Sequence, residues 1–182
     1  MAQKKDEIEK KWLIRCPDDK TLSTLNATPE YFVQTYLKTR ADKIERRIRA
    51  KTSLVKTSYI YTKKWPSDNL IKRPESDRDI SKLEYCLRLL LLGDKQLIKT
   101  RHCFWYKDQF FELDIYPDWT DDTAIMELEL ISETQKYEIP PQIEIIRDVT
   151  EDRAYKNAAL AKKITKNFSG RLIQNIFAGI GF

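Results

Sequence analysis

The chain has 182 residues, of which 41% are hydrophobic and 34% charged, with four glycines and seven prolines. This mixture excludes collagenous and low-complexity chains and is typical of one globular domain with a sizeable core. The 33 Lys and Arg residues exceed the 28 Asp and Glu residues, which gives a net charge of +5. This surplus is modest and interleaved, so it fits an anionic ligand without indicating nucleic acid.

The three cysteines, Cys16, Cys86 and Cys103, lie far apart, and no CxxC spacing occurs. Neither a structural zinc site nor a disulfide framework is therefore predicted. The N-terminal residues contain no apolar signal core, and the run from Leu89 to Leu92 is too short to cross a bilayer. We expect a cytoplasmic protein without a membrane partner.

Segments rich in β-branched and aromatic residues dominate the first three quarters of the chain. Strands are predicted at residues 6–15, 31–39, 43–52, 54–65, 95–107, 109–117 and 124–133. Residues 17–29 are turn-rich, and 66–79 are predicted to form a polar loop. A short helix is expected at 85–93, ended by Gly93, and residues 107–109 are predicted to form a hairpin turn.

The pattern changes near Asp148. Thr150 is predicted to cap a helix with an acidic first turn and apolar residues at helical spacing. Ser169-Gly170 breaks this helix, and 171–182 carry a second apolar stripe, which we expect to pack against the domain. The C-terminal helices should therefore span about 150–178.

Charged residues at a spacing of two recur in most of the predicted strands. In a strand over 6–15, Glu7, Glu9 and Lys11 share one face, while Ile8, Trp12 and Ile14 share the other. The same spacing recurs in the pairs Arg47/Arg49, Thr62/Lys64, Lys99/Arg101, Glu112/Asp114 and Glu127/Glu129. A solvated sheet face could produce such pairs, but it usually mixes charge signs within each strand.

Here some strands carry only cations and others only carboxylates, which favours a barrel with a charged interior. Carboxylate oxygens suit Mg²⁺ or Mn²⁺, and Arg and Lys suit phosphate oxygens. The residues therefore predict a site for a metal ion and a polyanion, with phosphate chemistry. Ile8, Trp12 and Ile14 are expected to pack outward under the helices.

Seven motifs occur in an order that resembles the CYTH, or triphosphate tunnel metalloenzyme, superfamily. The first is the ExExK sequence Glu7-Ile8-Glu9-Lys10-Lys11, and the last, DVTEDRAYKNAALA at 148–161, resembles the family's EVT-D-x-RYxNxxLA segment. The five between them are Arg47-x-Arg49, Thr62-x-Lys64, KTRH at 99–102, ELD at 112–114 and ELEL at 127–130. The resemblance covers about residues 6–161.

The resemblance implies an α+β protein whose single domain, residues 1–182, is a closed antiparallel eight-stranded β-barrel forming a tunnel, with flanking and C-terminal helices. It further implies a metal-dependent enzyme that hydrolyses triphosphate compounds, inorganic triphosphate first, through a metal-activated water. The implied phosphate-binding residues are Lys11, Arg47, Arg49, Lys64, Lys99 and Arg101. The implied Mg²⁺ or Mn²⁺ ligands are Glu7, Glu9, Glu84, Asp114, Glu127 and Glu129, and the implied catalytic residues are Glu7, Glu9, Lys11 and Glu129.

Two departures from the family pattern stand out. The family often has a Glu-x-Glu strand where this chain has Lys82-Leu83-Glu84-Tyr85, which leaves only Glu84 as a metal or water contact. Asp148 replaces the usual Glu before Val-Thr. Class IV adenylyl cyclase and thiamine triphosphatase activities stay open, because no residue set is specific for a purine or a thiazolium.

Two alternatives of another class remain. One is a module that binds triphosphate without turnover. The other is RNA binding through the basic stretch Lys38–Lys51, although RRM, KH and zinc-knuckle signatures are all missing from the sequence, so nucleic acid is disfavoured. His102, the single histidine, should lie on the strand face opposite Lys99 and Arg101 and have a structural role. A homodimer stays open.

Overall fold

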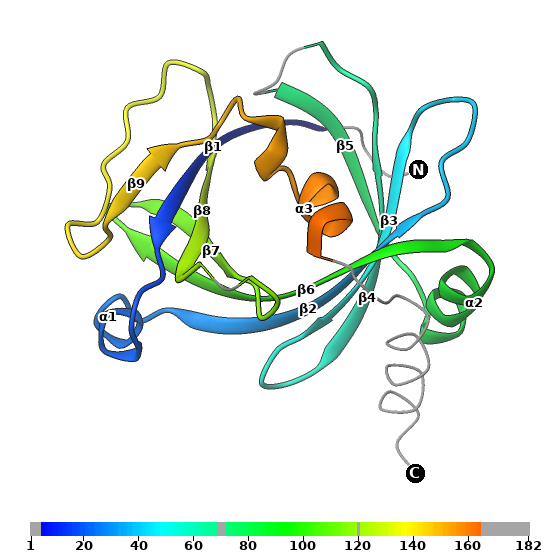
Figure 1. The fold of residues 1–182 in the computed structure, drawn as a ribbon, viewed down its shortest axis with the longest axis horizontal. Coiled ribbons are helices and arrows are strands. Elements are labelled where there is room, and N and C mark those ends of the chain that lie inside the picture. The colour runs from blue at the N-terminus through cyan, green and yellow to red at the C-terminus, as the bar shows by residue number, and fades with distance from the viewer. Residues whose placement is uncertain (1–4, 69–71, 120, 165–182) are drawn as a thin grey trace.

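Nine antiparallel strands form one strongly curved sheet in the computed structural model, which describes residues 5–68, 72–119 and 121–164, except for the side chains of 5–7, 72 and 164 (Figure 1). The strands are β1 (Lys5–Arg15), β2 (Thr28–Leu37), β3 (Glu45–Thr52), β4 (Thr57–Lys64), β5 (Lys72–Asp79), β6 (Gly93–Tyr106), β7 (Gln109–Ile115), β8 (Thr123–Leu130) and β9 (Ile145–Asp148). The helices are α1 (Asp19–Thr24), α2 (Lys82–Leu92) and α3 (Asn157–Ile164), with a 3-10 turn at Arg153–Tyr155.

The strand order brings distant parts of the chain together. It runs β5-β4-β3-β2-β6-β7-β8-β1-β9, and β5 also pairs with β1, from Lys5↔Glu75 to Ile8↔Lys72. β1 therefore pairs with β8 along one edge and with β5 and then β9 along the other. The predicted antiparallel, mostly β architecture is confirmed, and β9 is a ninth strand that the sequence did not indicate.

The outward face of β1 packs against the connection between β8 and β9. Trp12 and Ile14 join Met126 of β8 in an apolar cluster that also contains Ile143, with Tyr137 packed against it. Among the described residues, this cover comes from neighbouring strands, from Leu25 after α1 and from the β8–β9 connection, so the expectation that the face lies under helices is wrong for that part of the chain. Trp12 and Ile14 are buried as predicted.

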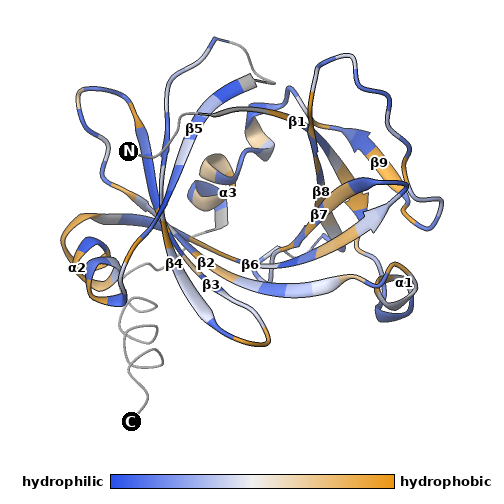
Figure 2. Ribbon diagram, turned by 180° about the vertical axis from the view of Figure 1, so that it is seen from behind, coloured by the Kyte–Doolittle hydropathy of each residue, from blue (hydrophilic) through white to orange (hydrophobic). Residues whose placement is uncertain are grey.

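The inward face of the sheet is divided into an apolar end and a charged end. At the apolar end, Tyr36, Leu97 and Ile125 form a cluster with Leu160 and Ala161 of α3. Figures 1 and 2 show α3 lying within the curve of the sheet. Two residues away from these positions on the same strands lie Gln34, Lys99 and Glu127, which line the charged end, so α3 covers one end of this face and leaves the other end open to a ligand.

α2 packs on the outside of the sheet, where its Tyr85 and Leu89 contact the cluster of Ile48 and Tyr61. The helix ends at Gly93, as predicted. No helix within the described part of the chain combines the length and apolar character that crossing a membrane requires.

Residues 66–79 contain the clearest error in the predicted elements. β5 lies at Lys72–Asp79, where a polar loop was expected, and it pairs with both β4 and β1. Its inward residues are charged and line a polar cavity, and the residues between them, such as Pro74 and Ser76, are not aliphatic or aromatic, so the strand lacks the apolar alternation by which strands are usually recognised. The other predicted strands are confirmed with shifted bounds, whereas α1 was not predicted.

The predicted helix start at Thr150 is also wrong, since α3 begins at Asn157. The hydroxyl of Thr150 instead accepts a hydrogen bond from the backbone N–H of Lys11 at 3.0 Å. This bond ties the segment before α3 to β1. The predicted stripe at 171–182 and the predicted helix beyond 164 lie outside the described residues.

Replacing Trp12 with Ala should destabilise the protein by roughly 3–5 kcal/mol, because the indole is 4% exposed and its loss leaves a cavity. Trp105→Ala is the matched control, since Trp105 is 68% exposed and should cost about 1 kcal/mol or less. Chemical denaturation of both variants measures the difference. Equal losses of stability would contradict this account of the core.

Candidate functional site

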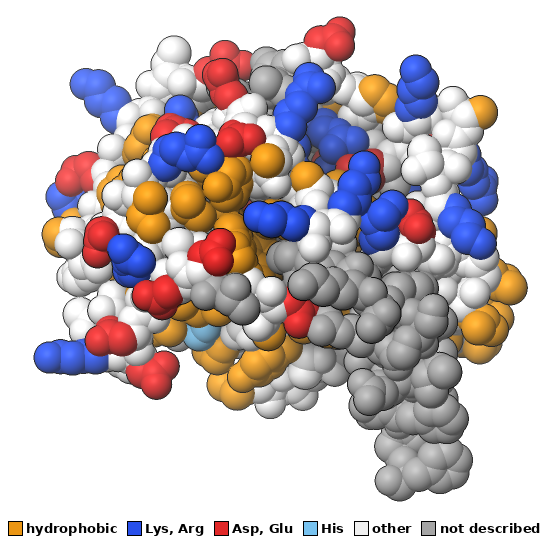
Figure 3. All heavy atoms as spheres, viewed as in Figure 1, with side chains coloured by type: hydrophobic (Ala, Val, Ile, Leu, Met, Phe, Trp, Pro, Cys, Tyr) orange, Lys and Arg blue, Asp and Glu red, His pale blue; other side chains and the backbone are white. Residues whose placement is uncertain are grey.

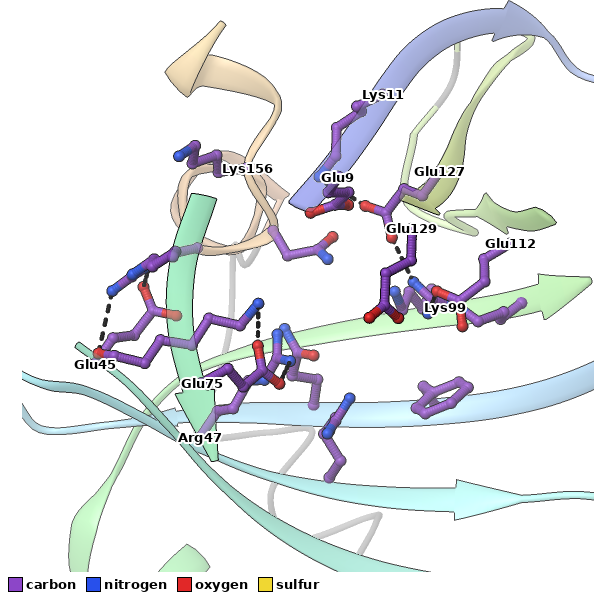
Figure 4. A pocket seen from close by; sticks show the side chains of 18 of the residues that line it. Glu9, Lys11, Glu45, Arg47, Glu75, Lys99, Glu112, Glu127, Glu129 and Lys156 are labelled. Atoms are coloured by element: carbon purple, nitrogen blue, oxygen red, sulfur yellow. Dashed lines mark hydrogen bonds and ion pairs between the residues drawn. The ribbon is translucent and has the colours of Figure 1, made fainter. Parts of the chain in front are cut away.

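A cavity of about 290 Å³ lies at the charged end of the inward sheet face (Figure 4). Strands β1 to β8 all contribute side chains to it, and the segment from Thr150 to Ala158 adds more. Nine of the predicted site residues line it together: Glu9, Lys11, Arg47, Arg49, Lys64, Lys99, Arg101, Glu127 and Glu129. Their spacing of two within each strand places them on one face.

Three predicted metal ligands are not among the described side chains that line the cavity. Glu84 lies on α2, where it pairs with Arg78 and Arg88, and does not line the cavity. Asp114 is fully buried beside the cavity and is bonded to cations. The backbone of Glu7 pairs with Arg73 in β1 and β5, but its side chain lies outside the described part of the structure.

Lys11 links the two acidic strands. Its ammonium lies 2.6 Å from Glu127 and 3.3 Å from Glu9, and in the register of β1 and β8 Lys11 is paired with Glu127 and Glu9 with Glu129. Burial lowers the pKa of Lys11, but the ion pairs with Glu127 and Glu9 outweigh it and hold the pKa above its ordinary value. Lys11 is therefore a permanently charged group on the side of the cavity formed by β1 and β8.

Arg101 is the centre of a second network, which joins β6, β7 and β8. Its guanidinium donates to Asp114 at 2.6 Å and to Glu127 at 2.8 Å, and it also pairs with Glu112. Lys99 pairs with the same Asp114. Burial and the neighbouring Arg101 lower the pKa of Lys99 to about 8, despite Asp114. Asp114, which is buried beside the cavity, thus holds the candidate phosphate-binding residues Lys99 and Arg101 in place.

Two carboxylates on β5 were missed by the sequence reasoning. Asp77 accepts from Arg49 at 2.6 Å and from the Thr62 hydroxyl at 2.5 Å. Glu75 lies 3.3 Å from Arg47 and pairs with Lys64 as well. Each predicted cation of β3 and β4 therefore already faces a carboxylate.

Glu75 and Asp77 also correct the comparison with the family motif. Lys82–Tyr85, taken as the degraded Glu-x-Glu strand, belongs to α2. The carboxylate pair at a spacing of two lies on β5 instead, and Glu75-x-Asp77 could have been found from the same period-two rule. The apparent replacement of a family Glu by Lys82 thus has no bearing on the cavity.

Further lining residues had weaker sequence signals. Arg73 lies 3.4 Å from Glu45, and both face the cavity. Lys156 comes from the segment just before α3, and Figure 4 places its side chain apart from the acidic group of Glu9, Glu127 and Glu129. Because Lys156 lies outside any strand, alternation could not indicate it.

The donor chemistry suits a hard cation, but the described side chains do not form a complete cage. Glu9 and Glu129 are direct register partners, and both line the cavity. Within residues 5–68, 72–119 and 121–164, no three His, Cys, Asp or Glu side chains gather closely enough to hold a metal alone. Mg²⁺ commonly uses one or two carboxylates together with substrate phosphates, so this pair fits such an ion.

The signs of the lining charges nearly balance. Among the described side chains, eight cations line the cavity: Lys11, Arg47, Arg49, Lys64, Arg73, Lys99, Arg101 and Lys156. Seven described carboxylates line it as well: Glu9, Glu45, Glu75, Asp77, Glu112, Glu127 and Glu129. The cavity is thus suited to a ligand that carries negative and positive charge together.

His102 and the cysteines do not line this cavity. Burial lowers the pKa of His102. Burial and the nearby Glu112 raise the pKa of Cys103 to about 12, so its thiol is protonated at neutral pH. These residues provide neither a nucleophile nor a base for this site.

The chain is similar to proteins of known activity. It is 32% identical over 159 residues to the inorganic triphosphatase of Nitrosomonas europaea, which covers 87% of this chain and 98% of that protein. No family model matches the chain.

Two solved structures support the same relationship at the level of the fold. A crystal structure of an inorganic triphosphatase is 30% identical, with a TM-score of 0.55 over 85% of this chain and 93% of that chain. The PH1819 protein of Pyrococcus horikoshii is 18% identical, with a TM-score of 0.55 over 70% and 80% of the two chains, which shows likeness of fold alone. The relative from Nitrosomonas europaea is matched over nearly its whole length, so the chain belongs to the triphosphate tunnel metalloenzyme (CYTH) superfamily.

Proposed function

We propose that this protein is a metal-dependent hydrolase of inorganic triphosphate, and that its sheet closes through β5 and β1 into an eight-stranded tunnel around the cavity. The pairing of Lys5–Ile8 with Lys72–Glu75 supports closure, since it joins the two ends of an eight-strand series and leaves only β9 outside. The observation that carries the function is the cavity itself, where eight cations and an acidic pair converge inside one curved sheet.

The cations of β3, β4 and β6 hold the phosphates in this proposal. Burial and the neighbouring Arg47 lower the pKa of Arg49, so these two cations crowd each other. The buried Nε of Arg49 also has no hydrogen-bond partner among the described residues. A phosphate oxygen would satisfy that donor, and an Arg fork suits phosphate geometry.

Glu9 and Glu129 hold a Mg²⁺ or Mn²⁺ ion together with the substrate's phosphate oxygens. When bound, the ion supplies neutralisation of phosphate charge and a more acidic water. Glu127 has a positioning role instead, because it holds Lys11 and Arg101 at 2.6 and 2.8 Å. Lys11, Arg47 and Arg101 then stabilise the charge that develops as the terminal phosphoryl group leaves.

Inorganic triphosphate is favoured over a nucleotide by the shortage of stacking surfaces. Phe32 and Tyr36 are the aromatic residues among the described lining residues. The Phe32 ring lies 5.6 Å from the Lys99 ammonium, and the Tyr36 hydroxyl accepts from Gln34 at 2.7 Å. Both side chains are also buried, at 5% and 7% exposure, which leaves little ring surface for a purine.

A panel assay tests this function. Inorganic triphosphate, ATP and thiamine triphosphate are supplied with Mg²⁺ or Mn²⁺, and the products are identified by chromatography. Orthophosphate and pyrophosphate from inorganic triphosphate, at a kcat/KM well above that for the other two, is the expected result. Release of cyclic AMP from ATP as the main product would favour the cyclase, and binding without turnover would favour a non-catalytic module.

Glu9→Gln and Glu129→Gln should each lower triphosphate turnover by orders of magnitude with little loss of stability. Each removes a carboxylate from the metal pair, while Lys11 keeps its 2.6 Å partner Glu127. Turnover assays and thermal melts measure the two effects, and Glu133→Gln, on an exposed residue outside the cavity, is the control. Full activity in either cavity variant, or after exhaustive chelation, would contradict the metal site. Glu127→Gln is a poorer test, because it also weakens a buried ion-pair network.

Triphosphate should raise the melting temperature of the wild-type protein, since a ligand at about 100 times its Kd adds roughly 2.7 kcal/mol of stability. Arg47→Ala/Arg49→Ala should abolish this rise, whereas Arg46→Ala, which removes the partner of Asp42 outside the cavity, should keep it. The rise within each variant is compared, because the double variant also loses ion pairs to β5. Salt-sensitive RNA binding that persists at saturating triphosphate would instead support a surface site.

A further inference from the structure

Helix α2 is apolar on two opposite faces. Its Tyr85 and Leu89 are buried against the sheet. The opposite face carries four leucines that are between 49% and 70% exposed, here called the leucine stripe: Leu83, Leu87, Leu90 and Leu91. In Figure 3, which has the view of Figure 1, hydrophobic side chains reach the surface where α2 lies. A helix with apolar side chains on both faces is typical of a position covered on both sides.

The leucine stripe is too small to hold a separate molecule firmly. A stable interface between two proteins usually takes about 20–30 residues from each side. The exposed Lys82 at the start of the helix and the Arg88–Glu84 ion pair beside the stripe limit its apolar width. A segment of the same chain needs less contact, because a short tether gives it an effective concentration on the order of mM.

The sequence after α3 contains an apolar stripe of matching length. α3 ends at Ile164, and the residues that follow lie outside the described part of the chain. Their apolar stripe, at helical spacing, consists of Leu172, Ile173, Ile176, Phe177 and Ile180. It extends from residue 172 to 180, and the leucine stripe extends from 83 to 91, so each would be about 12 Å long on a helix.

α2 and α3 cover the same end of β2 from opposite sides. Tyr36 packs in the cluster of α3, whereas the next residue, Leu37, packs in the cluster of α2. Neighbouring side chains of a strand point to opposite faces, so the two helices lie on opposite faces here. The backbone N–H of Lys38 then donates to the carbonyl of Leu92, the last residue of α2, at 2.8 Å.

The chain that follows α3 can therefore reach α2. Lys162, near the end of α3, lines a surface groove together with Lys43 of the connection that follows β2. Residues 165–170 can span about 20 Å when extended. Packed layers lie about 10 Å apart, so this length corresponds to the step from α3 past the end of the sheet to α2. Ser169-Gly170 supplies the break at which a second helix can change direction.

We propose that residues 171–182 form a helix that docks on the leucine stripe of the same chain. The docked helix covers the outer face of α2 and anchors the end of α3, whose first residues, Asn157 and Ala158, line the cavity. This inference concerns a surface outside the cavity and does not depend on the proposed function.

Cross-linking on the full chain tests the contact directly. A photo-reactive phenylalanine analogue in place of Leu87 should link to a peptide within 171–182 of the same molecule, which stays a monomer on a denaturing gel. The same analogue in place of Leu54 is the control, since Leu54 is 83% exposed on the β3–β4 connection and should give no such link.

Hydrogen exchange tests whether the contact holds the segment in place. We expect the amides of 172–180 to exchange about tenfold faster in Leu87→Lys/Leu91→Lys than in the wild-type protein. Lysine keeps a high helix propensity, so α2 itself should persist. Leu54→Lys/Val55→Lys, which adds equal charge at exposed apolar positions away from α2, should leave the exchange unchanged.

Variants in the segment provide the reciprocal measurement. Ile176→Lys should speed exchange of the segment as the α2 variant does, whereas Asn175→Lys, off the apolar stripe, should not. Thermal melts confirm that every variant is folded.

Four results would overturn the docking. One is a cross-linked dimer, which would assign the leucine stripe to a second copy of the chain. Another is a cross-link from position 87 that never reaches 171–182. The third is exchange of 172–180 in the wild-type protein at the rate of an unprotected peptide, which needs no variant. The fourth is equal acceleration in the α2 variant and in the Leu54/Val55 control, which would indicate a general effect of added charge.

Discussion

The carboxylate of Glu127 lies between two cations from different strands, 2.6 Å from Lys11 and 2.8 Å from Arg101. All three residues are nearly buried, and a buried charge without a partner costs several kcal/mol. The register of β1, β6 and β8 therefore gives the Glu127 carboxylate its two partners and allows it to carry its charge inward. Asp114, bonded to Arg101 and Lys99, extends the same dependence to β7. The fold can place charges inside the sheet only because each strand supplies the partner for another.

On the opposite side of the cavity, β5 likewise supplies partners of opposite charge for inward-facing cations. Arg47 and Arg49 would repel each other in an enclosed cavity, and Glu75 and Asp77 offset this repulsion. A bound phosphate chain offers the same cations stronger and more numerous acceptors. Binding would thus exchange carboxylate partners for phosphate oxygens, so the cavity gains affinity only by the difference between the two. This exchange keeps the phosphate-binding side chains ordered before the substrate arrives, which lowers the entropy cost of binding.

The parts of the site that local periodicity controls could be predicted from the sequence, and the parts set by distant contacts could not. Glu9, Lys11, Arg47 and Arg49 follow from alternation within single strands, which needs no knowledge of the partner strand. β5 was missed because neither of its faces is apolar: Arg73, Glu75 and Asp77 line the cavity, and the residues between them are Pro74 and Ser76, so the segment resembles a loop. Thr150 was assigned to a helix cap, whereas its actual partner, the backbone of Lys11, is 139 residues away in sequence. Glu84 matched a motif by order alone, and only the structure shows that it lies on α2.

The near balance of eight cations and seven carboxylates among the described lining residues restricts which ligands the cavity can hold. A bare polyanion would gain from the cations but would meet the carboxylates of Glu9 and Glu129 on the acidic wall. A metal ion without triphosphate would be repelled by the positive charges of Lys11 and Arg101. Each ligand therefore screens the charges that oppose the other, so metal and triphosphate should bind with positive coupling. Such coupling is reciprocal, and the triphosphate must raise the affinity for the metal by the same factor as the metal raises the affinity for triphosphate.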